Sequence, residues 1–211
     1  MRRVAFVVAA LSAILLGATG ARAGTFCQKA IATDHGKVVR STNGVIVYTN
    51  GSAVFACSES KHQAPGLVIL DKGYKVVQVE ASNGRCVAIR FGGAGKLDQI
   101  LMKDLGGKQV GSGVQDIGYG LSFGKVYSMS VSPNCAVAWG EATGGGSGPK
   151  TYRVRLEAFG SATSVPYGVV QEIATVKSVN DVKGVEVTAQ GRKVRVRWTE
   201  GGVAKAKVLP A

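Results

Sequence analysis

The stretch Arg192–Val208, RKVRVRWTEGGVAKAKV, alternates cationic and apolar residues on both sides of a glycine pair. Alternation with a period of two is typical of a β-strand with one buried face, and glycines between two such runs are typical of a hairpin turn. Comparable runs occur at Val76–Val79 and Val126–Val131, whereas no window after the N-terminal 23 residues places apolar residues at the helical spacing. The sequence therefore predicts an all-β fold.

The first 23 residues differ in composition from the rest of the chain. Two arginines precede an apolar run over residues 4–16, and small residues lead up to Ala23. This layout is typical of a secretory signal peptide with an A-x-A cleavage site, although an uncleaved membrane anchor is the alternative, since the run is close to a bilayer-spanning length. We expect cleavage after Ala23, which leaves 24–211 as a single all-β repeat domain that is secreted or associated with the cell envelope.

The chain is strongly basic, with 26 Lys and Arg residues against 13 Asp and Glu, a formal charge of +13. An exported basic protein is expected to meet anionic neighbours, such as a cell-wall polymer, a polysaccharide or lipid head groups. Specific nucleic-acid binding is not expected, because aromatic residues are not interleaved with the cations. No transmembrane segment is expected after signal cleavage.

All four cysteines follow the predicted signal peptide, and an even number in an exported chain predicts two disulfides. Four cysteines allow three connectivities. We favour Cys57 with Cys86 and Cys27 with Cys135, because this pairing links neighbouring segments and then fixes the N-terminus. No C-x-x-C pair or histidine cluster predicts a metal site instead.

One sequence motif recurs along the chain: a strand that begins with valine, a turn with Asn or Gly, and a second apolar strand. The copies are Val39–Tyr48, Val79–Ile89, Val131–Trp139 and Val187–Trp198. Their lead valines recur at intervals of roughly 40 to 56 residues, and periods of about 40 to 50 residues with several short strands each are typical of propeller blades.

A third strand follows the pair in most copies, and Leu67–Gly73 and Gln99–Lys108 each end in an acidic residue and a glycine turn. Over most of Lys37–Val208 the chain thus resembles divergent secreted bacterial β-propeller repeats of the TolB-like and WD40-like kind, although it contains no Trp-Asp dipeptide. The resemblance implies a closed or partly closed ring of about four blades with a binding surface, and it brings no catalytic residue. We expect roughly Phe26–Lys37 to pair with the last blade and close the ring; the alternative is a two-sheet β-sandwich.

The opening stretch also predicts a binding surface. A three-residue turn at 200–202 would keep both apolar sets on one face and place Arg197 opposite Lys205 and Arg195 opposite Lys207. Like charges directly opposite one another are destabilising, so a bound anion would reduce the repulsion between these cations. The alternative is that the cations only form a solvated face that protects an exposed sheet edge. The predicted anion-binding residues are Arg153, Arg155, Lys193, Arg195, Arg197, Lys205 and Lys207.

Hydrolytic chemistry has few candidates. The two histidines are His35, beside Asp34, and His62, and no serine lies in a G-x-S-x-G turn. We therefore predict no catalytic residue, metal or cofactor, and a secreted non-enzymatic binding or scaffolding module of the cell envelope or extracellular space with a basic face. The alternative is a hydrolase or lyase that acts on an envelope polysaccharide.

Overall fold

The computed structural model describes residues 25–106, 113–116, 124–144, 149–157 and 170–210. These residues contain fifteen strands in four antiparallel sheets, together with one α-helix and one 3-10 helix. The predicted all-β class is therefore confirmed at the level of secondary structure. The predicted signal peptide lies outside the described residues. No helix in the described part of the chain is long and apolar enough to cross a membrane.

The first two sheets each have four strands in the order in which the chain forms them. Sheet 1 consists of β1 (Lys37–Thr42), β2 (Val45–Asn50), β3 (Ala53–Ser58) and β4 (Gly66–Ile69). Sheet 2 consists of β5 (Lys75–Ser82), β6 (Cys86–Gly92), β7 (Gln99–Asp104) and β8 (Gly113–Asp116).

The last two sheets follow the same sequential order, but the final one has three strands. Sheet 3 consists of β9 (Gly124–Val131), β10 (Val137–Thr143), β11 (Thr151–Glu157) and β12 (Val170–Val176). The 3-10 helix η1 (Val179–Val182) leads to sheet 4, which consists of β13 (Glu186–Gln190), β14 (Lys193–Glu200) and β15 (Val203–Pro210).

The four copies of the sequence motif form the first hairpins of the four sheets, namely β1–β2, β5–β6, β9–β10 and β13–β14. Asn residues occupy left-handed conformations in two of the turns, with φ of 44° at Asn43 and 53° at Asn83. Asn tolerates this region better than most residues. The Asn and Gly residues of the motif therefore lie at the turns of these hairpins.

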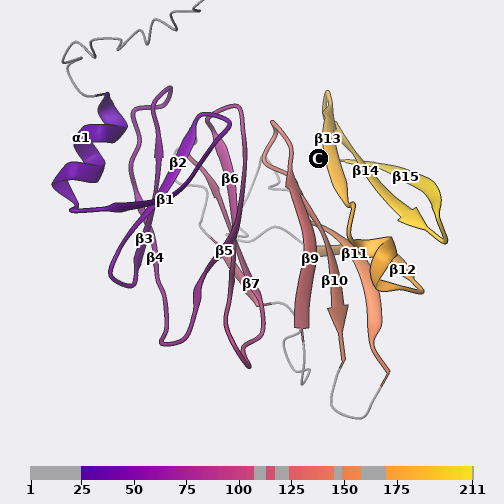
Figure 1. Ribbon diagram of the computed structural model, residues 1–211. Helices are drawn as coiled ribbons and strands as arrows, with labels where there is room; N and C mark the ends of the chain where they lie inside the picture. Colours follow the sequence, from indigo (N-terminus) through magenta and orange to yellow (C-terminus); the bar gives the residue numbers. More distant parts are fainter. Residues whose placement is uncertain (1–24, 107–112, 117–123, 145–148, 158–169, 211) are drawn as a thin grey trace, which may run out of the picture.

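The sheets pack face to face in chain order, so that sheet 1 lies at one end of the stack and sheet 4 at the other (Figure 1). A separate cluster of buried apolar side chains fills each of the three joints between neighbouring sheets. The first strands of neighbouring sheets also contact each other, β1 with β5, β5 with β9, and β9 with β13. No cluster among the described residues joins sheet 1 to sheet 4, and the two-sheet alternative does not describe this four-sheet stack.

The expected pairing of Phe26–Lys37 with the last sheet is wrong, because most of this segment forms helix α1 (Phe26–Thr33) against sheet 1. Thr25 and Gln28 form a capping box at the start of the helix. The Glu59 carboxylate accepts hydrogen bonds from the backbone N–H groups of Phe26 and Cys27, at 2.6 and 2.8 Å. These contacts satisfy first-turn donors that a helix leaves unpaired, so the helix is fixed at the end of the stack remote from sheet 4.

The favoured disulfide connectivity is also wrong, although two disulfides are present. Cys27 on α1 pairs with Cys57 on β3, and Cys86 at the start of β6 pairs with Cys135 in the turn before β10. The first bridge follows from the packing of α1 on sheet 1. The second joins sheets 2 and 3, which are neighbours in the stack.

The predicted register of the last hairpin is wrong by one residue. Gly201 and Gly202 alone form the turn, with φ of 58° and 82°, and Glu200 lies opposite Val203. Two residues with positive φ are typical of the type I′ turn, whose twist matches that of the flanking strands. Arg197 consequently lies opposite Ala206 and Arg195 opposite Val208, so the expected like-charge strain is absent.

Candidate functional site

The predicted anion-binding residues do not form one surface. Arg153 and Arg155 lie on β11, where the alternate residues Val154 and Leu156 pack toward sheet 4. Since side chains alternate along a strand, the two arginines lie on the opposite face of sheet 3, toward sheet 2. The buried carboxylate of Glu141 is 3.1 Å from Arg155 Nε, and Glu172 is 3.2 Å from Arg153 Nε. Their charges are thus largely satisfied within the protein.

The hairpin cations divide further. Val194, Val196 and Trp198 are buried against sheet 3, so Lys193, Arg195 and Arg197 lie on the outer face of sheet 4. Lys205 and Lys207 lie opposite Trp198 and Val196, and directly opposed residues share a face. The hairpin therefore presents cations on both faces rather than on one.

A different basic region lies between the first strands of sheets 1 and 2. At one end of these strands the hairpin turns touch: the Asn43 side-chain amide donates to the Ala81 carbonyl at 2.8 Å, and the Gly84 N–H donates to the Asn43 carbonyl at 2.8 Å. A Cβ on Gly44 would lie 3.1 Å from Gly84 Cα. The two sheets are therefore in close contact at this end, and the glycines permit the approach.

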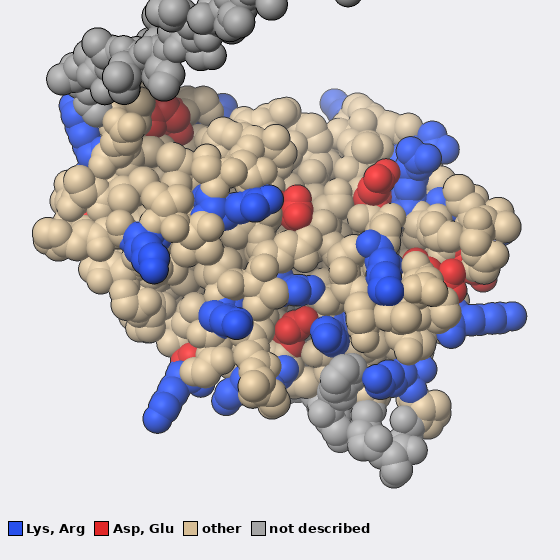
Figure 2. All heavy atoms as spheres, in the orientation of Figure 1, with Lys and Arg blue, Asp and Glu red and all other residues tan. Residues whose placement is uncertain are grey.

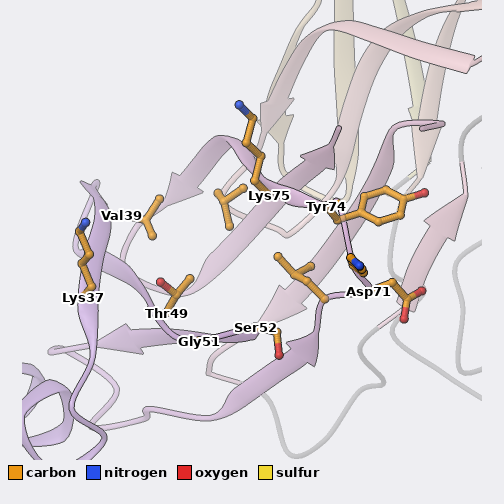
Figure 3. Close-up of a pocket in the computed structure, with 12 residues that line it drawn as sticks. Lys37, Val39, Thr49, Gly51, Ser52, Asp71, Tyr74 and Lys75 are labelled. Carbon is orange, nitrogen blue, oxygen red and sulfur yellow. The ribbon is translucent and has the colours of Figure 1, made fainter. Parts of the chain in front are cut away.

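The opposite end opens around the first residues of β1 and β5, Lys37 and Lys75 (Figure 3). A cavity of about 490 Å³ lies here, and a second cavity of about 310 Å³ continues along the same strands. Val39 and Val76 line both cavities. Together the cavities form one groove, called the β1/β5 groove below.

The β1/β5 groove combines apolar walls with cationic rims. Lys37 and Lys75 stand on opposite sides of the larger cavity, with Val39 between them and Tyr74 farther along (Figure 3). Lys96 Nζ lies 5.7 Å from the centre of the Tyr74 ring. The charged residues lining the two cavities are Lys37, Arg40, Lys72 and Lys75, with Asp71 and Glu80 as the acids.

The four lining cations outnumber the two lining acids. None of the four cations forms an ion pair within 4.0 Å with another residue in the described part of the chain, in contrast to Arg153 and Arg155. Across the face of the molecule drawn in Figure 2, Lys and Arg side chains also outnumber acidic ones. The groove therefore carries positive charge that is available to a ligand.

Two valines that line the groove are unusually exposed, Val39 at 42% and Val77 at 43%. The register of β1 skips Val39, and that of β5 skips Val77. A β-bulge at each position re-aims the side chain and ends regular pairing. The two bulges thus give the basic groove an apolar border that a ligand could cover.

Sequence reasoning missed this groove, because its cations are distant in the chain and become neighbours only when sheets 1 and 2 stack. One local signal was present. Lys37 and Lys75 are each the first residue of a strand and are each followed by two valines, and Lys72 lies in the turn before β5. Because β1 and β5 lie against each other in the stack, cations at the first residues of both strands lie at the same end of the two sheets.

Among the described residues, neither histidine forms an ion pair with an acidic side chain. The His62 ring packs edge-on against Phe26, with ring centroids 5.5 Å apart, and His35 has a left-handed φ of 50° just after α1. The carboxylate of Asp34, which precedes His35 in the sequence, accepts a hydrogen bond from the Tyr48 hydroxyl at 2.6 Å. Burial, together with this bond, raises the pKa of Tyr48. Within the described ranges, no three His, Cys, Asp or Glu side chains are grouped to hold a metal ion.

Comparison with known proteins assigns no family. No family model matches the chain, and no curated protein matches it in sequence.

Proposed function

We propose that the protein is a non-enzymatic binding or scaffolding module of the cell envelope or extracellular space, and that the β1/β5 groove binds an extended anionic polymer. The observation that carries this proposal is the set of four unpaired cations around an apolar-walled groove. Because the two cavities follow one another along the strands, a chain-like ligand fits them better than a compact one. A cell-wall polymer or acidic polysaccharide has the required chemistry.

The arrangement of the sheets supports a propeller-like module. Each sheet is a meander whose strands follow chain order, and successive first strands touch one another. Propeller blades have this local topology. We propose that the chain is an open relative of the small β-propellers, in which the groove between the first two blades replaces a central channel as the ligand site.

The proposed location outside the cytoplasm rests on the leader-like first 23 residues and on the cysteines. Both pairs are bonded, at sequence separations of 30 and 49 residues, and no cysteine in the described part of the chain is free. Disulfides of this kind persist in oxidising compartments. A positively charged module exported to an envelope would meet the anionic polymers that the groove is proposed to bind.

Binding to immobilised heparin, used as a model anionic polymer, tests the groove. We expect the variant Lys37→Gln/Lys72→Gln/Lys75→Gln to bind about tenfold more weakly than the wild type, since each exposed charge pair contributes roughly 0.2–1 kcal/mol. The slope of log affinity against log salt should also become shallower, because fewer counterions are exchanged.

The matched control is Lys193→Gln/Lys205→Gln/Lys207→Gln, which removes the same charge from sheet 4. This control should bind nearly as well as the wild type. If the two triple variants lose affinity equally, binding reflects net charge alone and the groove is not the site. Release of new reducing ends from an acidic polysaccharide by the wild type would instead identify a hydrolase or lyase.

A further inference from the structure

The edge strand β15 of sheet 4 differs from the other edge strands in the described part of the chain. Five of these edge strands have one residue left out of the pairing register, as in a β-bulge: β1, β4, β5, β9 and β12. Two others are short, since β8 has four residues and β13 has five. Bulges and short strands are the usual means of preventing further strand pairing at an edge. In contrast, β15 pairs with β14 at eight consecutive positions without a shift.

The backbone of β15 offers a regular row of unpaired groups. The two-residue turn makes Glu200 and Val203 a hydrogen-bonded pair, and such pairs alternate along an antiparallel ladder. The N–H groups of Ala204, Ala206 and Val208 therefore point away from β14. Every residue of β15 except Leu209 is exposed, so this row is open to solvent.

The side chains of β15 indicate the chemistry of a partner. Lys205 and Lys207 alternate with the outward-bonding residues, so in an added antiparallel strand they would occupy non-hydrogen-bonded pairs, where opposed side chains come closest. Neither lysine forms an ion pair within 4.0 Å with another described residue. Ala204 and Ala206 leave room on the other face for larger apolar side chains.

These features disfavour a second copy of the same strand as the occupant. In a symmetric antiparallel pair that keeps the faces aligned, Lys205 could lie opposite Lys207 of the other copy, and opposed like charges are destabilising. Acidic side chains at every second position of a partner would instead form cross-strand ion pairs.

We propose that the free edge of β15 binds an extended segment of a partner protein by strand addition, and that this segment alternates acidic and apolar residues. Main-chain hydrogen bonds to the Ala204–Val208 edge hold the segment, while Lys205 and Lys207 select its acidic face. Sheet 4 then gains a fourth strand, the number present in each of the other three sheets. The β1/β5 groove is not involved, so this interaction is independent of the proposed polymer binding.

A short fluorescent peptide that alternates glutamate and valine is the probe, and fluorescence anisotropy with the purified protein measures its affinity. Ala206→Pro removes one outward N–H without removing a bond to β14, so it should weaken peptide binding by about tenfold or more. The control Ala206→Ser keeps the N–H and should bind as the wild type does. Thermal unfolding should show that both variants fold.

A second pair of measurements tests the charge selection. Lys205→Glu/Lys207→Glu should lose the glutamate peptide and bind a peptide that alternates lysine and valine. In the wild-type complex, amide hydrogen exchange at Ala206 should slow. Equal binding of the glutamate peptide by Ala206→Pro and Ala206→Ser would overturn the proposal. So would a wild-type dimer that Ala206→Pro dissociates, since a second copy would then occupy the edge.

Discussion

The joint between sheets 2 and 3 and the joint between sheets 3 and 4 solve the same packing problem with different chemistry. Across the first joint, the Cys86–Cys135 disulfide links the two sheets. The Asp98 carboxylate accepts a hydrogen bond from the Val126 N–H at 2.8 Å, and an Arg90 side-chain N–H group donates to the Val126 carbonyl. This joint therefore combines a covalent bond with charged side chains.

Across the joint between sheets 3 and 4, β9 and β10 contact residues 182–185 through neutral groups. The Ser128 hydroxyl donates to the Val182 carbonyl at 2.6 Å and accepts from the Val185 N–H at 3.2 Å. Gly140 on β10 lies so close to η1 that a Cβ would be 2.1 Å from the Val182 carbonyl oxygen. The first joint should thus respond to reducing agents and pH, whereas the second depends on the absence of a side chain at one position.

Loss of the inter-sheet disulfide should have the largest effect. The Cys86–Cys135 bridge closes a loop of 49 residues, so Cys86→Ala/Cys135→Ala should reduce the free energy of unfolding by about 4 kcal/mol through the entropy of the unfolded chain. Urea unfolding measures this loss. Hydrogen exchange should accelerate in the strands that face the joint between sheets 2 and 3.

The other disulfide is the matched control. The Cys27–Cys57 bridge closes a loop of 30 residues, so its removal should cost about 3.5 kcal/mol and increase hydrogen exchange in α1 rather than at the joint. The same exchange pattern in both variants would show that neither bridge acts locally.

The joint between sheets 3 and 4 should be most sensitive to Gly140→Ala. The new methyl group would collide with the Val182 backbone, and overpacking of this kind costs about 3 kcal/mol. Thermal unfolding of the variant, with hydrogen exchange at β13, measures the damage. The control is Gly184→Ala, where a Cβ meets nothing within 4 Å; its stability should change by no more than about 0.5 kcal/mol. Equal stability of the two variants would mean that η1 can move away without cost.

The strands and the turns of the first hairpins could be predicted from the sequence, because alternation and Asn-Gly pairs act locally. Helix α1 could not, since it is eight residues long and its anchors, Cys57 and Glu59, lie far along the chain. Short helices depend on tertiary packing more than on their own propensity.

The register of the last hairpin was misread for a different reason. The alternation of Ala and Lys in β15 suggested one buried face, but nearly the whole strand is exposed. A strand without a buried face specifies its register weakly from side chains, and the turn residues Gly201 and Gly202 decide it instead. The β1/β5 groove was missed because stacking, which local patterns do not report, brings Lys37 and Lys75 to one opening.

The smallest expected effect is the pH response of the joint between sheets 2 and 3. Burial raises the pKa of Asp98 above its ordinary value of 3.8, although the hydrogen bond from Val126 and the charges of Arg90 and Lys125 oppose this shift. A carboxyl group with a raised pKa favours its neutral form in the folded protein. Its contribution to stability is therefore greatest below its ordinary pKa and is lost as pH rises through the raised pKa.

Asp98→Asn removes this titration and keeps an oxygen that can accept the Val126 N–H. The stability of the wild type relative to Asp98→Asn should therefore fall as the pH increases from about 3 to about 7, as measured by thermal unfolding of both proteins at each pH. Other carboxyl groups titrate in both proteins, so the difference isolates Asp98. The opposite slope would mean that the hydrogen bond and the nearby cations outweigh burial, and that the charged carboxylate holds sheets 2 and 3 together.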